Sequence, residues 1–237
     1  PITIVCSEKG WIRAMKGHME NTGDLKYKEG DRERFVFHAE TTDKILMFAT
    51  DGRFYTIPAD RLPGGRGNGQ PVRFFIDMEE GQDIVMLFVH RPGRKLLVAS
   101  RSGHGFVIAE DDVVALRRPG KLALNVSVED EAVACAVVEG DHVAVIGENR
   151  KLLLFPLADV PEMSRGKGVK LQKYKDGGLS DAKTFTAKEG LTIFDRSGRA
   201  RSFSKSELKE WFGSRAQAGR LPPKGFPRSE KFGNKLD

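Results

Sequence analysis

Residues 143–170 read VAVIGENRKLLLFPLADVPEMSRGKGVK and hold five parts in order: an apolar strand, a polar turn, a second apolar strand, a short acidic helical turn and a basic box. The box is the segment Ser164-Arg-Gly-Lys-Gly168. The same order of parts is found four more times along the chain. Because parts in a fixed order at a regular period are typical of repeat architectures, residues 143–170 define the repeat unit of this fold.

The polar turn between the first two strands marks each unit. These turns end at positions 10, 52, 103, 150 and 198, so that their spacings are 42, 51, 47 and 48 residues. That period suits a four-stranded propeller blade. A hairpin turn needs a residue with positive φ, which glycine adopts most easily, and glycine ends four of the five turns. In the fourth unit Arg150 stands at the glycine position, and Asn149 is expected to take the left-handed conformation instead.

Apolar residues recur at matched places on both sides of each turn. Five positions before the turn stand Val5, Met47, Val98, Val145 and Ile193. A further apolar or β-branched residue lies two positions earlier in every unit, and this period of two predicts strands with one face in a core. Short helical turns are expected after the second strand, and Ser204-x-x-Glu207 has the pattern of a capping box. The sequence therefore predicts an all-β, propeller-like fold of about five four-stranded blades, with one short helix near 204–212.

Length and composition indicate one folded domain. A chain of 237 residues with 39% hydrophobic residues can bury a large single core, and we expect the domain to span residues 1–226. The tail from 227 to 237 is expected to be disordered, since the sequence there is polar and basic. Cys6 and Cys135 lie in separate apolar runs and are expected to be buried free thiols. The chain begins within strand-like sequence at Pro1, which suggests a domain cut from a longer polypeptide.

Charge is distributed unevenly along the chain. Residues 1–164 hold 21 Lys and Arg against 25 Asp and Glu, whereas residues 165–237 hold 18 against 8. An asymmetry of this size indicates a polyanionic partner near the second part. A solvated basic tail explains residues 224–237 but not residues 165–201, where the charges lie between strands.

Four units carry a box in which glycine alternates with Arg or Lys, at residues 64–69, 117–121, 164–168 and 214–220. Glycine lets a backbone approach a phosphate and present its N–H groups, and the cations add salt-dependent attraction. Since a propeller places equivalent loops on one edge of every blade, the boxes predict a series of phosphate contacts. The sequence has none of the spacings of zinc fingers, helix-turn-helix motifs or RNA-recognition motifs, so we expect readout of DNA backbone and shape with little sequence preference.

Residues suited to catalysis or metal binding are scattered. The five histidines form no His-x-x-x-His pair, and residues 64–69 resemble a dinucleotide motif without opening a helix. Ser102-Gly-His104 is interpreted as a turn, and the pair Asp111-Asp112 as the start of a helical turn. No catalytic residue, metal site or cofactor is predicted in this chain, and no apolar run is long enough to cross a bilayer.

The segment Lys9-Gly-Trp-Ile-Arg13 followed by Lys16-Gly-His18 resembles the first blade of the C-terminal domain of bacterial topoisomerase IV A subunits, which belong to the type IIA topoisomerases. The resemblance extends over nearly the whole chain, through Asp51-Gly-Arg-Phe-Tyr-Thr-Ile57, residues 62–71 and Lys151-Leu-Leu-Leu-Phe-Pro156. Gyrase A subunits are close relatives, but their Gln-Arg-Arg-Gly-Gly-Lys-Gly box is absent from residues 14–30. This departure favours the topoisomerase IV type and argues against strong DNA wrapping.

The resemblance implies a β-pinwheel, a propeller-like disc whose blades exchange a strand and bind bent double-stranded DNA along the outer rim. It implies a non-catalytic domain that helps to select the DNA substrate for decatenation and supercoil relaxation. The catalytic tyrosine and the sites for ATP and Mg²⁺ would lie in other domains, and the parent enzyme would contain two ATPase B subunits and a second copy of this polypeptide. We expect the isolated domain to be monomeric and the enzyme to be cytoplasmic, on the nucleoid, without a membrane segment.

The candidate DNA contacts are basic residues that match family motifs or repeat boxes. They are Lys9, Arg13, Lys16, Arg53, Arg66, Arg117, Arg118, Lys121, Lys151, Arg165, Lys167, Lys170, Arg199, Arg201, Arg215 and Arg220. Three other interpretations stay open at this point: a gyrase-type wrapping domain, a propeller that serves as a protein-interaction platform, and a free-standing enzyme. A platform of the commonest propeller type would carry Trp-Asp dipeptides, which this sequence lacks.

Overall fold

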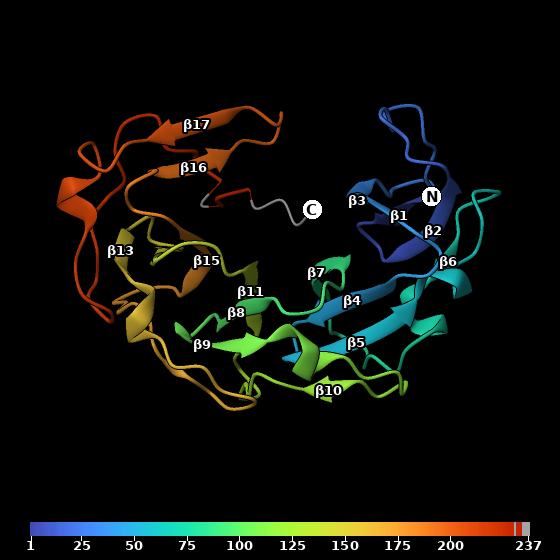
Figure 1. The fold of residues 1–237 in the computed structure, drawn as a ribbon, viewed down its shortest axis with the longest axis horizontal. Coiled ribbons are helices and arrows are strands. Elements are labelled where there is room, and N and C mark those ends of the chain that lie inside the picture. The colour runs from blue at the N-terminus through green and yellow to red at the C-terminus, as the bar shows by residue number, and fades with distance from the viewer. Residues whose placement is uncertain (230, 234–237) are drawn as a thin grey trace.

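The computed structural model describes residues 1–229 and 231–233 of the chain. Its strands form five antiparallel sheets that follow one another around an open arc (Figure 1). The first and last sheets lie at the two ends of the arc, and among the described residues no strand pairing joins them. Each sheet is one blade, which confirms the predicted all-β, propeller-like architecture.

The first three blades have four strands each. Blade one contains β1 (Ile2–Ser7), β2 (Trp11–Lys16), β3 (Glu33–Ala39) and β6 (Gln70–Pro71). Blade two contains β4 (Lys44–Ala49), β5 (Arg53–Pro58), β7 (Ile84–Val89) and β10 (Lys121–Leu122). Blade three contains β8 (Lys95–Ser100), β9 (His104–Ala109), β11 (Ala132–Val137) and β14 (Val169–Lys170).

The last two blades have fewer strands than predicted. Blade four contains β12 (His142–Gly147), β13 (Leu152–Pro156) and β15 (Leu179–Phe185), and Arg220 adds a single antiparallel bridge to Leu152 where the other blades have a short fourth strand. Blade five contains β16 (Leu191–Phe194) and β17 (Ala200–Phe203).

Neighbouring blades exchange their short outermost strand. β6 follows β5 of blade two in the sequence but pairs with β2 of blade one. β10 and β14 are displaced by one blade in the same way. The exchange ties each unit to the unit before it, as the pinwheel resemblance implied.

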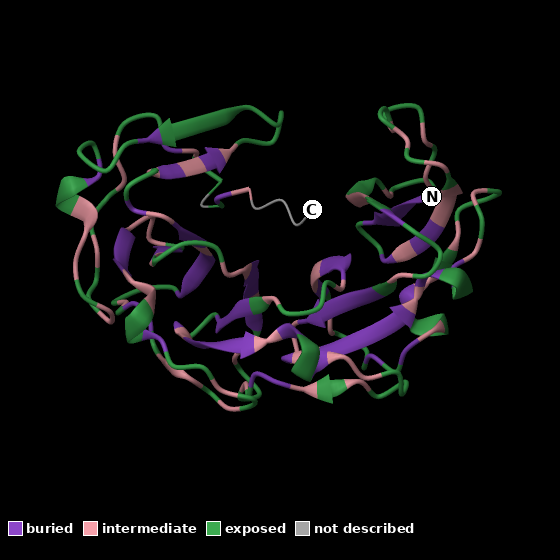
Figure 2. Cartoon of the chain, in the orientation of Figure 1, coloured by how far each residue is buried: buried purple, intermediate pink, exposed green. Residues whose placement is uncertain are grey.

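The core lies between the blades rather than in the middle of one globule. Ile45 and Met47 face a cluster shared with blade one, whereas Leu46 and Phe48 face a cluster shared with blade three. The strands of the inner blades are therefore buried on both faces, and Figure 2 shows them as buried ribbons inside exposed outer loops. The predicted period of two is present, but it sorts side chains between two apolar clusters, not between core and solvent.

The turn that marks each unit has the expected geometry at its glycines. φ is +83° at Gly10, +80° at Gly52, +88° at Gly103 and +84° at Gly198. In the fourth unit the prediction for Asn149 is wrong, because Arg150 itself adopts φ +68°. The Asn149 side chain instead accepts a hydrogen bond from the Lys151 amide at 3.0 Å, which closes the turn without a left-handed asparagine.

The short helical turns after the second strands are 3-10 turns. They are η1 (Ala59–Arg61), η3 (Glu110–Val113), η4 (Leu157–Asp159) and η5 (Lys209–Trp211), and a further turn, η2 (Val72–Phe74), follows β6. The capping box is present: the Glu207 amide donates to Ser204 Oγ at 3.2 Å, and the Ser204 amide donates to Glu207 Oε1 at 3.1 Å. The helix expected near 204–212 is thus a capped turn followed by one turn of 3-10 helix.

The end of the described chain packs against blade five. Phe226 and Phe232 are buried in the cluster shared by blades four and five. The Phe194 amide donates to the Phe232 carbonyl at 2.9 Å, and the Phe232 amide donates to Asp181 Oδ2 at 2.9 Å. Residues 231–233 of the expected disordered tail are held by these contacts, because Phe232 supplies apolar area that the polar composition of the tail obscures. Residues 230 and 234–237 of that expectation lie outside the described residues.

Candidate nucleic-acid interface

Each basic box is a loop held at both ends by the second strand of the preceding blade. At its start, the box of residues 64–69 forms a parallel bridge from Gly64 to Ala14, and just after its end Gln70 pairs with Ile12. The later boxes repeat this arrangement on β5, β9 and β13. All four loops consequently follow the convex outer edge of the arc (Figure 1).

The last glycine of each box stands against a carbonyl group of the strand that holds the box. A Cβ on Gly69 would lie 2.2 Å from the carbonyl oxygen of Ile12, and the corresponding distances to the facing carbonyl oxygens are 2.3 Å at Gly120, 2.1 Å at Gly168 and 2.5 Å at Gly219. The facing carbonyl belongs in every case to the residue two positions after the marking turn, namely Ile12, Phe54, Gly105 or Leu152. These glycines are required for close backbone packing, whatever the box binds.

Nine of the sixteen candidate cations make no ion pair and no side-chain hydrogen bond with the described part of the chain. They are Lys9, Lys16, Arg66, Arg117, Lys151, Arg165, Lys167, Lys170 and Arg199. All but Lys151, which is half-buried, are exposed. Their charges are therefore available to an external anion.

Arg13 does not lie on the surface. It is 5% exposed, and its guanidinium donates to the Gly67 carbonyl at 2.7 Å and to the Lys26 carbonyl at 2.7 Å. Because its donors are used inside the protein, Arg13 fixes the position of the first box and is not available to a phosphate. The interpretation of Arg13 as a direct contact is corrected accordingly.

Several other candidates are also engaged within the protein. The Arg53 Nε donates to the Pro119 carbonyl at 3.0 Å, and the Lys121 ammonium donates to the Asp112 carbonyl. Arg118 forms an ion pair with Asp77 at 3.0 Å. The remaining engaged candidates are Arg215, which donates to the Lys170 carbonyl; Arg220, which lies 4.0 Å from Glu210; and Arg201, which stacks over Phe203.

The box of residues 164–168 and the strand that follows it carry three cations that make no ion pair with the described residues. Arg165, Lys167 and Lys170 are exposed within six residues of one another. Their field reaches His104 on the neighbouring strand: burial lowers the pKa of His104, the charges of Lys167 and Lys170 lower it further, and the charge of Asp130 offsets part of this. This blade therefore presents a positive field that no described carboxylate neutralises by direct pairing.

Sequence reasoning missed Lys173, which is exposed and whose amide donates to the Gln217 carbonyl of the last box at 3.0 Å. It joins the cations of residues 164–170 to the box of residues 214–220. The sequence signal that could have identified Lys173 as a candidate DNA contact is its position, five residues after Gly168 and three after Lys170.

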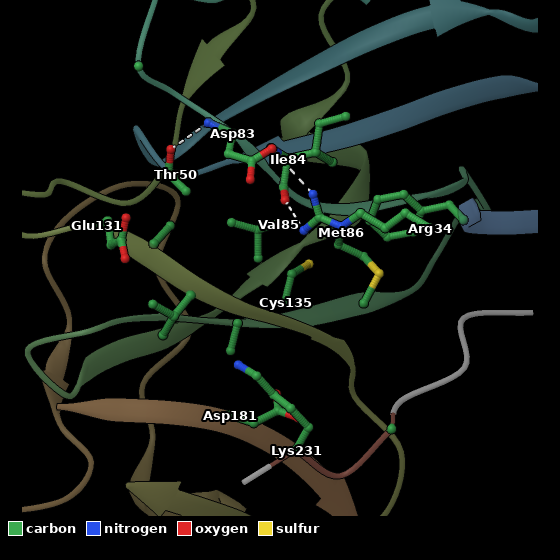
Figure 3. A pocket seen from close by; sticks show the side chains of 16 residues that line it. Arg34, Thr50, Asp83, Ile84, Val85, Met86, Glu131, Cys135, Asp181 and Lys231 are labelled. Carbon is green, nitrogen blue, oxygen red and sulfur yellow. Dashed lines mark hydrogen bonds and ion pairs between the residues drawn. The ribbon is translucent and has the colours of Figure 1, made fainter. Parts of the chain in front are cut away.

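The inner side of the arc has a different character. A cavity of about 630 Å³ lies between β7, β11 and β15 and the end of the described chain (Figure 3). Arg34 pairs there with Asp83 at 3.3 Å, and Lys231 donates to the Ser180 carbonyl at 2.5 Å. Burial raises the pKa of Asp181, whose carboxylate accepts the Phe232 amide. These polar groups hold the inner strands and the terminal segment together.

Within the described residues, no cluster of three or more His, Cys, Asp or Glu side chains is arranged to hold a metal ion. The same part of the chain contains no helix of the length and apolarity that a membrane crossing requires. Cys6 and Cys135 are buried free thiols, as expected.

A family model and the sequences of known proteins indicate the same family for this chain. The model of the DNA gyrase C-terminal domain, described as a β-propeller, matches residues 43–90, 94–139 and 141–179. The A subunit of DNA topoisomerase 4 from Caulobacter vibrioides is 49% identical over 98% of this chain, and its counterpart from Rickettsia bellii is 42% identical over 98%. The chain spans only 30% and 31% of the length of these two relatives.

Solved structures agree with the sequence comparisons. The Escherichia coli ParC C-terminal domain superposes with a TM-score of 0.80 at 29% identity, covering 96% of this chain and 95% of that one. A DNA gyrase A C-terminal domain superposes with a TM-score of 0.68 at 16% identity, covering 97% and 80%, which is a likeness of fold alone.

Proposed function

This chain belongs to the DNA gyrase C-terminal domain family, and from that premise we propose that it is the DNA-binding and DNA-bending domain of a topoisomerase IV A subunit. The observation that carries the proposal is the row of four equivalent basic loops along one convex edge. A convex row of cations suits the backbone of a bent duplex, because successive phosphates can meet successive loops.

The cations of the boxes contact the DNA backbone and do not read the base sequence. The exposed candidates are Lys and Arg side chains on loops, and such groups position a duplex without reading its bases. The arc has no described helix that could enter a major groove, since its helical segments are 3-10 turns of three or four residues. In the parent enzyme this domain would hold a DNA segment beside the cleavage core and bias the choice between decatenation and relaxation.

The whole enzyme is part of the same proposal. The parent protein would be an ATP-dependent type II DNA topoisomerase that acts on chromosomal DNA in the cytoplasm. It would assemble with two ATPase B subunits and with a second copy of itself, and ATP and Mg²⁺ would bind to domains outside this chain. The domain itself would supply no catalytic group to strand passage.

The affinity of the domain for a linear duplex, measured at several salt concentrations, tests the DNA-binding function. A plot of log affinity against log salt concentration should be linear with a slope of about −4 to −6, because each phosphate contact releases close to one counterion. Binding to a second duplex of unrelated sequence should be within about threefold at the same salt concentration. A flat salt response, as expected of a protein-interaction platform, would contradict the function.

DNA binding should also raise the pKa of His104. In the free protein, burial lowers this pKa, Lys167 and Lys170 lower it further, and Asp130 raises it by less than these lower it. Phosphates beside the two lysines would offset their field, so the pKa of His104 is higher in the complex than in the free protein. DNA binding then takes up protons, and the affinity for DNA rises as the pH falls from the pKa of the complex to the pKa of the free protein. Chemical-shift titration of the His104 ring with and without duplex measures this. The double variant Lys167→Gln and Lys170→Gln should raise the free pKa and shrink the DNA effect, and a pKa that DNA does not move would contradict the placement.

A further inference from the structure

Phe74 is a large aromatic side chain exposed on the outer edge of the arc. It ends η2, which directly follows the outermost strand of blade one, and it is 64% exposed. Its ring touches only the edge of the Phe75 ring among the aromatic contacts of the described residues, with centroids 5.2 Å apart. Burying an exposed ring of this size is favourable for any partner that covers it.

The first unit is three residues longer than the others at this place. The amides of Asn125 and Lys173, five positions after Gly120 and Gly168, donate to carbonyls of the next box, whereas in the first unit the amide that donates to the next box is that of Asp77, eight positions after Gly69. Phe74 therefore lies in an added turn, η2, and its exposed ring is not needed to complete a blade. The Asp77 amide donates to the carbonyl of Arg118, so this turn presents the ring beside the box of residues 117–121.

The backbone of η2 is held by two arginines. Arg118 donates from Nη1 to the Phe74 carbonyl at 2.9 Å, from Nη2 to the Arg73 carbonyl at 3.3 Å, and from Nε to Asp77 at 3.0 Å. Arg73 donates three hydrogen bonds to carbonyls of residues 78–82, at 3.0 to 3.1 Å. These hydrogen bonds fix the segment that presents the ring, so that a bound partner meets a preorganised aromatic group.

We propose that Phe74 contacts the bases of the DNA on this edge, by inserting its ring at a base step from the minor groove and kinking the duplex there. The proposal rests on the DNA-binding function proposed above and adds to it a defined point of bending. Arg117 is exposed and makes no ion pair with the described residues, and it would hold the duplex over this place. Apolar wedges flanked by cations are the means by which minor-groove proteins kink DNA, and pyrimidine–purine steps open most readily.

The test uses the chain with Phe74→Ser and a linear duplex that has a TA step in every helical turn, with 2-aminopurine replacing the adenine of each step. Phe74→Ser should lower affinity about fivefold or more and abolish the rise in 2-aminopurine fluorescence that the unsubstituted chain produces on binding. The slope of log affinity against log salt concentration should stay unchanged, since no cation is removed. Phe74→Trp should retain both signals. Thermal unfolding should be unaltered, because the side chain is exposed.

Val128→Ala is the matched control: Val128 is an exposed apolar residue, 102% accessible, but its aliphatic side chain has no ring that could stack on a base. It should change neither signal. The inference is overturned if the unsubstituted chain binds with the expected salt dependence while Phe74→Ser binds and unstacks bases equally well, and the DNA-binding function then stands. It is also overturned if sedimentation shows that the unsubstituted chain self-associates through this ring and Phe74→Ser does not.

Discussion

Replacing both cations of the fourth unit's box by glutamine, Arg165→Gln with Lys167→Gln, is expected to weaken DNA binding about 30-fold at 0.15 M salt. Each phosphate contact contributes about fivefold at this concentration, and the slope of log affinity against log salt concentration should fall by about 1.8. Both side chains are exposed and make no ion pair with the described residues. Their replacement therefore removes positive charge from the DNA-binding edge without removing a contact that stabilises the fold. Titration of a labelled duplex over a range of salt concentrations gives both quantities.

The double variant Lys44→Gln with Lys188→Gln is the control of equal net charge. Lys44 begins β4 and Lys188 lies on the turn from β15 to β16, and both are exposed and make no ion pair with the described residues. This pair should change affinity by about threefold at most, through long-range attraction that salt screens. Equal losses from the two double variants would mean that net charge alone governs binding and that the boxes have no special place in it.

The second large effect is one of stability and concerns the glycine that ends a box. Gly69→Ala should lower the free energy of unfolding by about 3 kcal/mol or more, because its Cβ would lie 2.2 Å from the Ile12 carbonyl oxygen and the short strand β6 would have to leave β2. Gly67→Ala, in the same box, is the control: its φ of +77° is similar, but nothing lies within 4 Å of its added Cβ. That variant should lose only about 1 to 2 kcal/mol, the cost of a left-handed alanine.

Urea unfolding of the two variants and of the unsubstituted chain separates these terms. Gly69→Ala should also weaken DNA binding, since the loop that carries Arg66 loses its anchor, whereas Gly67→Ala should bind nearly as well as the unsubstituted chain. Equal stability losses would show that conformational strain alone explains the glycine, and that the exchange of strands between blades does not depend on close backbone approach at this point.

Much of the architecture was predictable because the repeat constrains it. Glycines at 10, 52, 103 and 198 have the positive φ that their turns demand, and the pairing of Ser204 with Glu207 follows from local capping chemistry. These features depend on residues close together in sequence. Local rules therefore located the units, their first two strands and the turns between them.

The features that were not predicted depend on contacts that local rules do not decide. The left-handed Arg150 could not be foreseen, since an asparagine beside it offered two ways of closing the turn and the side-chain hydrogen bond to Lys151 decided between them. The buried Phe232 is held by Phe194 and Asp181 from other strands. The smaller number of strands in blades four and five likewise depends on pairing between distant segments, which periodicity alone does not reveal.

The candidate site was predictable as a set of loops but not residue by residue. A basic residue beside a glycine has the same sequence signature whether it points to solvent or holds a neighbouring loop. Arg13 and Arg118 hold loops, through the Gly67 carbonyl and the Phe74 carbonyl, whereas Arg165 and Lys167 are exposed to solvent. The difference depends on carbonyl groups far away in the sequence, and only the folded arrangement shows it.

The most direct test of the central claim, that the box loops of the convex edge meet the DNA, is to compare the chemical reactivity of each lysine in the free and DNA-bound domain by mass spectrometry. Lys167, Lys170 and Lys173 should be protected from acylation by a saturating linear duplex at low salt, and protection should disappear at high salt. Lys44, the first residue of β4, and Lys188, on the turn from β15 to β16, are exposed outside the boxes and should remain as reactive as in the free domain. Protection of Lys44 and Lys188 with continued reactivity of Lys167 and Lys170 would contradict the account.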